Sequence, residues 1–358
     1  MTSVNYGLIG FGGIAEGRIA PEGFALDQRR FEPLREAKLI AATSRSDRRR
    51  SAAEAMGLRW YESVEDLLGA QEIDAVFIAS NNASHYREAL AAIDAGKHLL
   101  MDKPITTSLE EARKIQSEAK RRGLSLSVNQ MMDHNVFNEA ARESIASGRI
   151  GSVGELALHL EFGYGSSPEE AASWRCSRPE ERGGPIGDVG SHCLYMAEFL
   201  LGSRIARLGC AFAPKTLDIA VESGAMMRFE TESGVSGRIR VAFDAGGRSL
   251  ESTLLGCGYE AYGSKGILRG YGTLGQLSGH EDEPVSLRVE LDDFVSSQPV
   301  RVAESENIYA AVVREHAQSV LNGAPMDGED AIHNLELILA AYDSAERGGE
   351  MIDMETKA

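Results

Sequence analysis

The chain has 358 residues, of which 43% are hydrophobic and 25% are charged, and its formal net charge at pH 7 is -17. This length exceeds one ordinary core and predicts two domains, while the composition argues against extensive disorder. The negative charge argues against nucleic acid or an anionic membrane as the main partner, because phosphate groups would be repelled.

Membrane spans, export signals and disulfides are not expected. No apolar run approaches the ~20 residues that a membrane span requires. The first residues lack the charged and apolar regions of a secretory signal. Widely spaced cysteines without a C-x-x-C pair are typical of reduced, mostly buried thiols, with disulfides or a metal site as the alternative. We therefore expect a cytoplasmic protein whose thiols are Cys176, Cys193, Cys210 and Cys257.

Residues 1–129 alternate short apolar runs with longer segments of helical period. This alternation is typical of repeated βαβ units and a parallel sheet. A capping box of Ser108 and Glu111 is expected to open the last helix of this part. The expected strands are Tyr6–Gly10, Lys38–Thr43, Ala75–Ala79, His98–Met101 and Leu124–Val128, and the expected helices are Arg48–Met56, Val64–Leu68, Ser84–Ala95 and Leu109–Arg122.

A G-x-G-x-x-A pattern at residues 10–15 follows the first expected strand directly. Gly10 allows a tight turn, Gly12 lets backbone N–H groups approach a pyrophosphate, and Ala15 permits close packing of the next helix. The N-terminus of that helix adds partial positive charge. The pattern predicts a dinucleotide site, and a glycine-rich turn without a ligand is the alternative.

The end of the second expected strand indicates which dinucleotide binds. NAD enzymes usually place Asp or Glu there for the ribose 2′-hydroxyl, whereas NADP enzymes use a small polar residue and an Arg. Here the strand runs into Ser44 and Arg45, and Asp47 is expected to cap the following helix. An Arg can pair with a 2′-phosphate and stack on adenine. NADP is therefore favoured over NAD.

Lys103 follows the fourth expected strand, between Asp102 and Pro104. In a doubly wound sheet the carboxyl ends of the strands face the ligand crevice. A lysine at that edge can serve as a general acid or base. The alternative is a surface lysine before a turn proline.

The pattern changes after Asn129, and the second part of the chain reads as an α+β domain with a mostly antiparallel sheet. A short, ordered junction is expected near residues 129–135. The segment 262–266 is a turn signal between two strands. The expected helices are Val136–Ser147, His192–Leu201, Ile308–Leu321 and Glu329–Glu346, and the expected strands are Leu156–Phe162, Ala225–Phe229, Val235–Phe243, Leu250–Cys257 and Leu287–Leu291.

A second candidate cluster lies at residues 183–192, where glycines free the backbone and a helix is expected to begin near Asp188 or Gly190. Asp188 and His192 are four residues apart, so both project from one helix face. They could orient a hydroxyl and pass a proton, because histidine is suited to proton transfer near neutral pH. Two alternatives remain: Asp188 caps the helix while His192 is a core residue, or the pair binds zinc, for which no third ligand has suitable spacing.

At these residues the chain resembles the Gfo/Idh/MocA oxidoreductases, the glucose–fructose oxidoreductase, inositol dehydrogenase and rhizopine-catabolism family, over nearly its whole length. Besides the glycine turn, residues 80–85 are similar to the family's T-P-N-x-x-H segment, with Asn81 in place of proline. Residues 96–104 are similar to A-G-K-H-V-x-x-E-K-P, with Asp102 in place of Glu. The family's W-R…G-G-G-x-x-x-D-x-G-x-H signature matches at Trp174, Arg175, Gly183, Gly184, Asp188, Gly190 and His192, with Pro185 in place of the third glycine.

The resemblance implies an N-terminal Rossmann domain at 1–129 and a substrate-binding and oligomerisation domain at 130–358, with the last helices able to pack back on the first. It implies a homodimer or homotetramer through the open face of the second domain's sheet. Lys103 would be the acid/base, completed by Asp188 and His192, and Asp102 would hold the ribose.

The cofactor-binding set is expected to be Gly10, Phe11, Gly12, Gly13, Ile14, Ala15, Ser44, Arg45, Ser80, Asn82, His85, Asp102, Lys103, Pro104 and Asn129. The substrate-binding set is expected to be Lys103, Gln130, Trp174, Arg175, Asp188 and His192, with Asp133 and His134 as weaker candidates. Trp174 could instead be a core residue, and Arg175 could instead pair with a neighbouring carboxylate. No metal is expected.

The chain is therefore expected to transfer hydride between a nicotinamide and a sugar, polyol or sugar derivative, the cofactor supplying the hydride chemistry and the protein the alignment and proton relay. The same acid/base serves alcohol oxidation and carbonyl reduction, so the residues do not tell the direction. One alternative is a dehydrogenase or reductase for a non-sugar substrate such as a dihydrodiol. The other is a non-catalytic redox sensor, against which the joint presence of Lys103, Asp188 and His192 argues.

Overall fold

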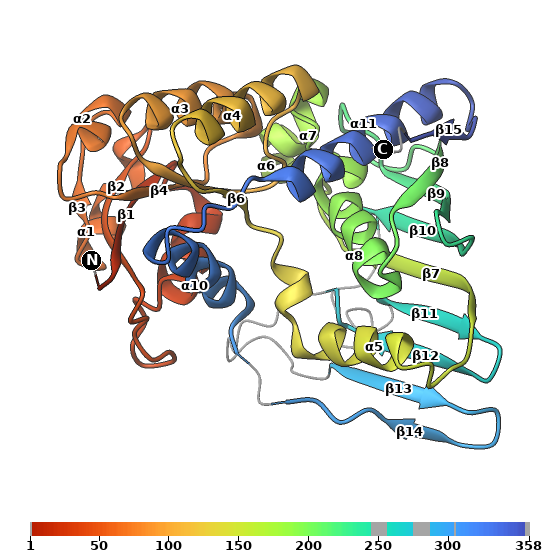
Figure 1. Cartoon of the computed structure of the whole chain (residues 1–358). Helices are drawn as coiled ribbons and strands as arrows, with labels where there is room; N and C mark the ends of the chain where they lie inside the picture. The colour runs from red at the N-terminus through yellow and green to blue at the C-terminus, as the bar shows by residue number, and fades with distance from the viewer. Residues whose placement is uncertain (1, 245–255, 275–286, 304–305, 355–358) are drawn as a thin grey trace. The chain divides into compact units, whose positions relative to one another are not determined.

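The computed structural model describes residues 2–244, 256–274, 287–303 and 306–354 (Figure 1). The chain divides into two compact units, residues 1–131 with 306–335, and residues 132–305 with 336–358. Among the described helices, none is long and apolar enough to cross a membrane.

The first unit contains a six-stranded sheet in the order β3-β2-β1-β4-β5-β6. Every neighbouring pair is parallel, which confirms the doubly wound sheet. The central strand β4 is a fully buried apolar run, and β1 is buried apart from Asn5, as expected for a sheet covered on both faces. The strands are β1 Val4–Ile9, β2 Ala37–Thr43, β3 Arg59–Trp60, β4 Ala75–Ile78, β5 His98–Met101 and β6 Leu126–Val128.

Helices cover both faces of this sheet. Figure 1 shows α2, α3 and α4 on one side and α10 on the other. The helices of the first unit are the π-helix η1 Ala15–Gly23, the 3-10 helix η2 Asp47–Arg49, α1 Arg50–Ala55, α2 Val64–Gly69, α3 Asn82–Asp94, α4 Leu109–Arg121 and α10 Ile308–Leu321.

Two local expectations in this unit were wrong. Ser108 precedes α4, but its side chain accepts no capping hydrogen bond. Instead its backbone N–H donates to the Thr106 hydroxyl at 3.0 Å, so a local turn replaces the capping box. Asp47 does not cap the helix after β2, because the Ser46 hydroxyl accepts the bond from Arg48 N at 3.3 Å.

The second unit contains a nine-stranded sheet in the order β14-β13-β12-β11-β7-β10-β9-β8-β15. All pairs are antiparallel except β7 with β10, so the expectation of a mostly antiparallel sheet is confirmed. Most of the expected strand Leu250–Cys257 lies outside the described residues. The strands are β7 Val153–Glu161, β8 Ile205–Phe212, β9 Gly224–Thr231, β10 Ser236–Ala242, β11 Cys257–Gly263, β12 Gly266–Tyr271, β13 Arg288–Asp292, β14 Ser297–Pro299 and β15 Ile352–Asp353.

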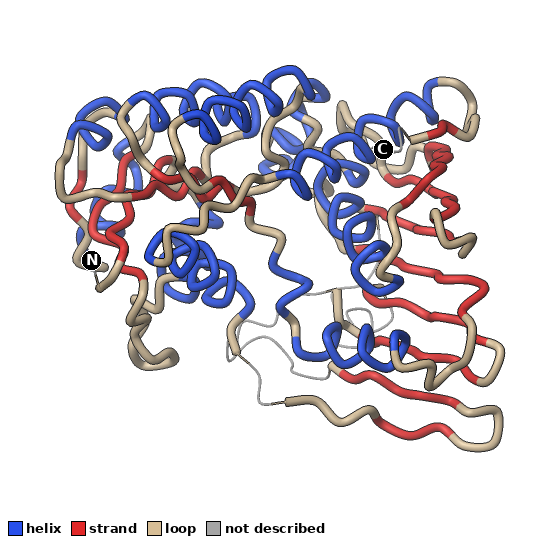
Figure 2. The backbone as a smooth tube through the Cα atoms, in the orientation of Figure 1, coloured by secondary structure: helices blue, strands red, loops and turns tan. Residues whose placement is uncertain are grey.

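The helices of this unit lie on one face of its sheet (Figure 2). Side chains of β9 and β10 alternate between buried and exposed, because none of the described helices covers the other face. Helix α8 is buried almost all round, which explains its mostly apolar sequence. The helices are η3 Met131–His134 at the junction, α5 Val136–Ala146, α6 Pro168–Ala172, α7 Trp174–Ser177, η4 Pro179–Glu181, η5 Ile186–Gly190, α8 Ser191–Leu201 and α11 Glu329–Glu346, which runs from the first unit into the second.

All four cysteines are free and buried, as expected. They belong to the second unit. Burial raises the pKa of Cys210 and of Cys257 to about 12. At neutral pH these thiols are therefore protonated and behave as small apolar side chains.

Candidate active site

The glycine turn is held between the ends of two other strands. Gly10 has a φ of 91°, and the N–H groups of Gly10 and Phe11 both donate to the Thr43 carbonyl at the end of β2, at 2.9 and 3.1 Å. A Cβ at Gly10 would lie 2.5 Å from the Ser80 nitrogen, just past β4. Gly10 is thus required both by its backbone angle and by this close approach.

The space over the turn fits a phosphate. A Cβ at Gly12 would meet no atom closer than the Gly10 carbonyl oxygen at 3.8 Å, and Gly13 is exposed. The helix that follows begins there, so its first N–H groups have no partner within the helix. Such a helix start binds anions, and the open surface at Gly12 is where a dinucleotide pyrophosphate would lie.

Cations outnumber carboxylates after β2, where residues 44–50 contain four arginines and one aspartate, Asp47. Arg45 is exposed, and its Nη2 donates to Asn81 Oδ1 at 2.9 Å. Arg49 forms an ion pair with Glu16, and its guanidinium lies 4.0 Å from where a Gly13 Cβ would be. A ribose 2′-phosphate fits such a cationic rim better than a 2′-hydroxyl does.

His85 connects the segments that follow β4 and β5 by contacts with a backbone carbonyl of each. It is fully buried, and its Nδ1 lies 2.9 Å from the Pro104 carbonyl oxygen, while its Nε2 lies 3.2 Å from the Ser80 carbonyl oxygen. The Lys103–Pro104 peptide bond is cis. Of the expected cofactor-binding residues, His85 therefore supports the backbone of Ser80 and Pro104.

Asp102, Lys103 and Asn129 lie at the ends of neighbouring strands. Asn129 N donates to the Met101 carbonyl at 2.8 Å, and its side-chain amide donates to Asp102 Oδ1 at 3.3 Å. Lys103 is half-buried beside them. The carboxyl ends of parallel strands meet at one edge of the sheet. The first unit therefore brings together at that edge Gly10, Ser44, Arg45, Ser80, Asp102, Lys103, Pro104, Asn129 and Gln130.

Sequence reasoning missed Glu88, which lies under the same edge. It is buried on α3, and its Oε2 accepts a hydrogen bond from the Ser80 hydroxyl at 2.5 Å. Burial raises the pKa of this carboxyl. No signal in the sequence separates Glu88 from the exposed acids of other helices.

In the second unit, Trp174, Arg175 and Asp188 form a group. The Arg175 guanidinium lies 4.5 Å from the Trp174 ring centre, and its Nε lies 3.7 Å from Asp188 Oδ2. The expected alternative that Arg175 pairs with a carboxylate is thus confirmed. Asp188 lies inside the π-helix η5, whose N-cap is Pro185, so the alternative in which Asp188 caps the helix is wrong.

His192 has a hydroxyl partner on its own helix. It is 5% exposed, and its Nδ1 lies 3.1 Å from the Tyr195 hydroxyl. That hydroxyl also accepts a hydrogen bond from Met132 N at 3.0 Å. Tyr195, which sequence reasoning missed, therefore holds the imidazole in one orientation.

Lys103 belongs to the first unit, and Asp188 and His192 belong to the second. Their convergence at a nicotinamide stays a prediction.

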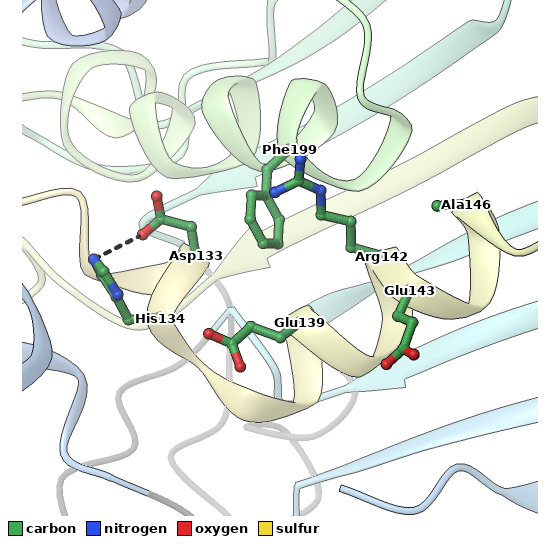
Figure 3. Close-up of a pocket in the computed structure, with 7 residues that line it drawn as sticks. All are labelled: Asp133, His134, Glu139, Arg142, Glu143, Ala146 and Phe199. Carbon is green, nitrogen blue, oxygen red and sulfur yellow. Dashed lines mark ion pairs between the residues drawn. The ribbon is translucent and has the colours of Figure 1, made fainter. Parts of the chain in front are cut away.

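An open pocket of about 390 Å³ lies in the second unit, mainly between α5 and α8 (Figure 3). Asp133 and His134, the weaker substrate candidates, line it, and their Oδ1 and Nε2 atoms are 3.9 Å apart. The Arg142 guanidinium lies 4.6 Å from the Phe199 ring centre. Glu139, Glu143 and Ala146 complete the lining, which contains none of the three expected catalytic residues. Across the described part of the chain, no cluster of His, Cys, Asp or Glu could hold a metal ion.

Two family models match the chain. The model of the oxidoreductase family with an NAD-binding Rossmann fold matches residues 4–130, and the model of the GFO/IDH/MocA C-terminal domain matches residues 138–269. Together they cover both parts of the expected architecture.

Similar proteins include sugar oxidoreductases. A 1,5-anhydro-D-fructose reductase of Ensifer adhaerens is 30% identical over 299 residues, covering 82% of this chain and 84% of the relative. An NADP(+)-dependent D-xylose 1-dehydrogenase of Haloferax volcanii is 30% identical, covering 67% of this chain and 69% of the relative. The crystal structure of an aldose-aldose oxidoreductase from Caulobacter crescentus, complexed with glycerol, has a TM-score of 0.83 at 19% identity, covering 98% of this chain and all of that one (100%), and shows the same fold.

Proposed function

The chain belongs to the Gfo/Idh/MocA family of NAD(P)-binding oxidoreductases, and from that premise we propose that it transfers hydride between NADP and a secondary alcohol or carbonyl of a sugar or polyol. One observation supports this most strongly. A single sheet edge holds the glycine turn, the cation Arg45 and the amine of Lys103. A phosphate-binding turn and a proton-transfer group at one edge suit a nicotinamide enzyme better than a non-catalytic sensor.

Bound NADP supplies the hydride acceptor, or NADPH the donor. In the oxidative direction, Lys103 takes the proton of the substrate hydroxyl as the hydride leaves its carbon. In the reductive direction the same amine returns that proton to the carbonyl oxygen. Asp188 and His192 orient the neighbouring hydroxyls through hydrogen bonds.

The residues around Asp188 favour a substrate with several hydroxyl groups. The Arg175 guanidinium at 3.7 Å neutralises the carboxylate and restricts its rotation. Asp188, Arg175 and His192 together present both acceptors and donors, a combination that suits vicinal hydroxyls. Trp174, with Arg175 against its ring, supplies an apolar wall for a sugar face.

The test is a panel of sugars, polyols and keto sugars with NADP(H) and NAD(H), followed by the absorbance of the reduced nicotinamide. We expect turnover with at least one polyhydroxylated substrate and a preference for NADP. Lys103→Ala should lower kcat on the order of 10²- to 10⁴-fold, since general acid–base catalysis contributes that much. It should still bind NADPH.

Turnover by Lys103→Ala at the wild-type rate would overturn the assigned acid/base. Turnover of dihydrodiols alone would replace sugars and polyols by a non-sugar substrate class. Tight NADPH binding without turnover of any substrate would favour a redox sensor.

We also propose a homodimer or homotetramer formed through the uncovered face of the nine-stranded sheet. On that side of the second unit, Met226 of β9 is 48% exposed and lies opposite Ala211 of β8, which is also exposed. Exposed apolar side chains on a sheet face are typical of an interface. The expected result is a dimer or tetramer mass by light scattering, reduced by Met226→Glu, and a monomer mass for the wild type would overturn the proposal.

Free, buried thiols suit a reducing compartment, so we propose a cytoplasmic location.

A further inference from the structure

The segment that bears Asp188 packs very closely on the residues beneath it. A Cβ at Gly184 would lie 2.5 Å from both carboxylate oxygens of Glu222. A Cβ at Gly187 would overlap the Arg182 carbonyl oxygen. Neither position has room for a side chain, so the path of this segment depends on the groups below it.

Glu222 is the polar group at the centre of this contact. Its Oε1 accepts a hydrogen bond from Ile186 N at 2.9 Å and another from the Tyr342 hydroxyl at 3.1 Å. Ile186 is the first residue of η5, and Tyr342 lies on α11. The Arg182 guanidinium in turn lies 4.8 Å from the centre of the Tyr342 ring. One carboxylate oxygen thus joins three separate segments of the second unit.

The Glu222 carboxylate stabilises the first turn of η5, the helix that contains Asp188. The first N–H groups of a helix lack partners within it, and a negative charge there is favourable. Two residues further on, Asp188 N donates to the Gly184 carbonyl at 2.8 Å, and the Ser191 hydroxyl donates to the Asp188 carbonyl at 2.8 Å. The chain then runs directly into α8, which carries His192. A shift of Ile186 would therefore move the backbone of Asp188.

We propose that Glu222 is a positioning residue for the hydride transfer proposed above: by anchoring Ile186 and Tyr342, it sets where Asp188 and His192 meet the substrate. This inference rests on the proposed function. Glu222 is half-buried, and this burial raises the pKa of its carboxyl, in agreement with its close packing against the segment that bears Asp188.

The experiment compares Glu222→Ala, Glu222→Gln and the wild type, with a matched control in the same unit. Glu260 also accepts a tyrosine hydroxyl, that of Tyr262 at 2.5 Å, but it lies on β11, away from the segment that bears Asp188. Glu260→Ala is the control for loss of a carboxylate–tyrosine pair. The measurements are kcat and KM for the substrate found in the panel, the dissociation constant of NADPH, and the thermal midpoint.

We expect Glu222→Ala to lower kcat on the order of tenfold to a hundredfold, because a displacement of about 1 Å can cost 10²-fold. Its dissociation constant for NADPH should stay that of the wild type, since the glycine turn belongs to the first unit. Glu222→Gln keeps an oxygen that accepts both hydrogen bonds, so it should restore most of kcat. Glu260→Ala should keep wild-type kcat.

Wild-type kcat in a folded Glu222→Ala would overturn the inference while leaving the proposed function intact. If Glu222→Ala weakens NADPH binding and lowers the thermal midpoint along with kcat, the inference is also overturned, because such a general loss indicates a merely structural role. If Glu222→Ala does not fold, Tyr342→Phe is the second variant, because it removes one of the two donors to Glu222. In Tyr342→Phe, kcat should fall by a larger factor than KM changes. Wild-type kcat in that variant would reject the inference. A wild type without turnover would remove both the function and the inference.

Discussion

The two glycines of the turn should respond differently to the same added methyl group. At Gly10 an alanine would have to adopt a φ of 91° and place its Cβ 2.5 Å from the Ser80 nitrogen. The backbone conformation costs roughly 1–2 kcal/mol. Forcing apart a packed strand end adds about 1–3 kcal/mol. Gly10→Ala should therefore lose about 2–5 kcal/mol of unfolding free energy, and nucleotide binding with it.

At Gly12 the methyl group would project into open space, 3.8 Å from the nearest atom. The free energy of unfolding of Gly12→Ala should therefore lie within about 0.5 kcal/mol of the wild-type value, like that of other substitutions at uncrowded positions. Its Cβ would occupy the place proposed for the pyrophosphate. We expect NADPH binding to weaken at least tenfold, about 1.4 kcal/mol.

The assays are urea unfolding without ligand and titration of NADPH fluorescence. Wild-type NADPH affinity in Gly12→Ala would show that the pyrophosphate does not lie over this turn. Wild-type stability in Gly10→Ala would show that the close approach to Ser80 is absent in solution.

Three further results are expected. Arg45→Asp should weaken NADPH relative to NADH by about tenfold to a hundredfold, because a charge-assisted hydrogen bond contributes about 1.5–3 kcal/mol; an unchanged preference would remove the 2′-phosphate interpretation. His192→Asn should lower kcat at neutral pH more than it lowers the thermal midpoint, and collapse of the fold would instead favour a core histidine. Burial lowers the pKa of His316 to about 3. Since the unfolded chain binds its proton near pH 6.5, stability should be complete above that pH and fall as pH drops towards 3, by about 2 kcal/mol at pH 5. Urea unfolding at pH 8 and pH 5 should show a difference about 2 kcal/mol smaller in His316→Gln, and an equal difference would contradict the assignment.

The sequence predicted the first unit's sheet well because its long strands are mostly buried and apolar, with Asn5 and Lys38 as exceptions. Ala75–Ala79 corresponds to β4 with one residue of error at its end, and Tyr6–Gly10 corresponds to β1 but begins two residues late and ends one residue late. β3 was missed because it has two residues and is partly exposed. In the second unit, β8 was missed because a register shift between Ile205 and Arg207 interrupts its alternation.

The local contacts of the predicted site residues were not predictable from the sequence. The π-helices η1 and η5 have no pattern of their own, since a wider turn depends on packing that a sequence does not record. The contact of His85 with Pro104 joins residues 19 apart through β5. Glu222 and Tyr342, 120 residues apart, meet only in the folded unit.

Because of where the cysteines lie, their chemical labelling reports local unfolding of the second unit. The first unit contains none, and the four in the second are buried. A thiol reagent reacts with the exposed thiolate, so its rate follows how often this unit opens. A compound that binds the second unit should slow the labelling, which allows substrate analogues to be ranked by mass spectrometry before any turnover is observed.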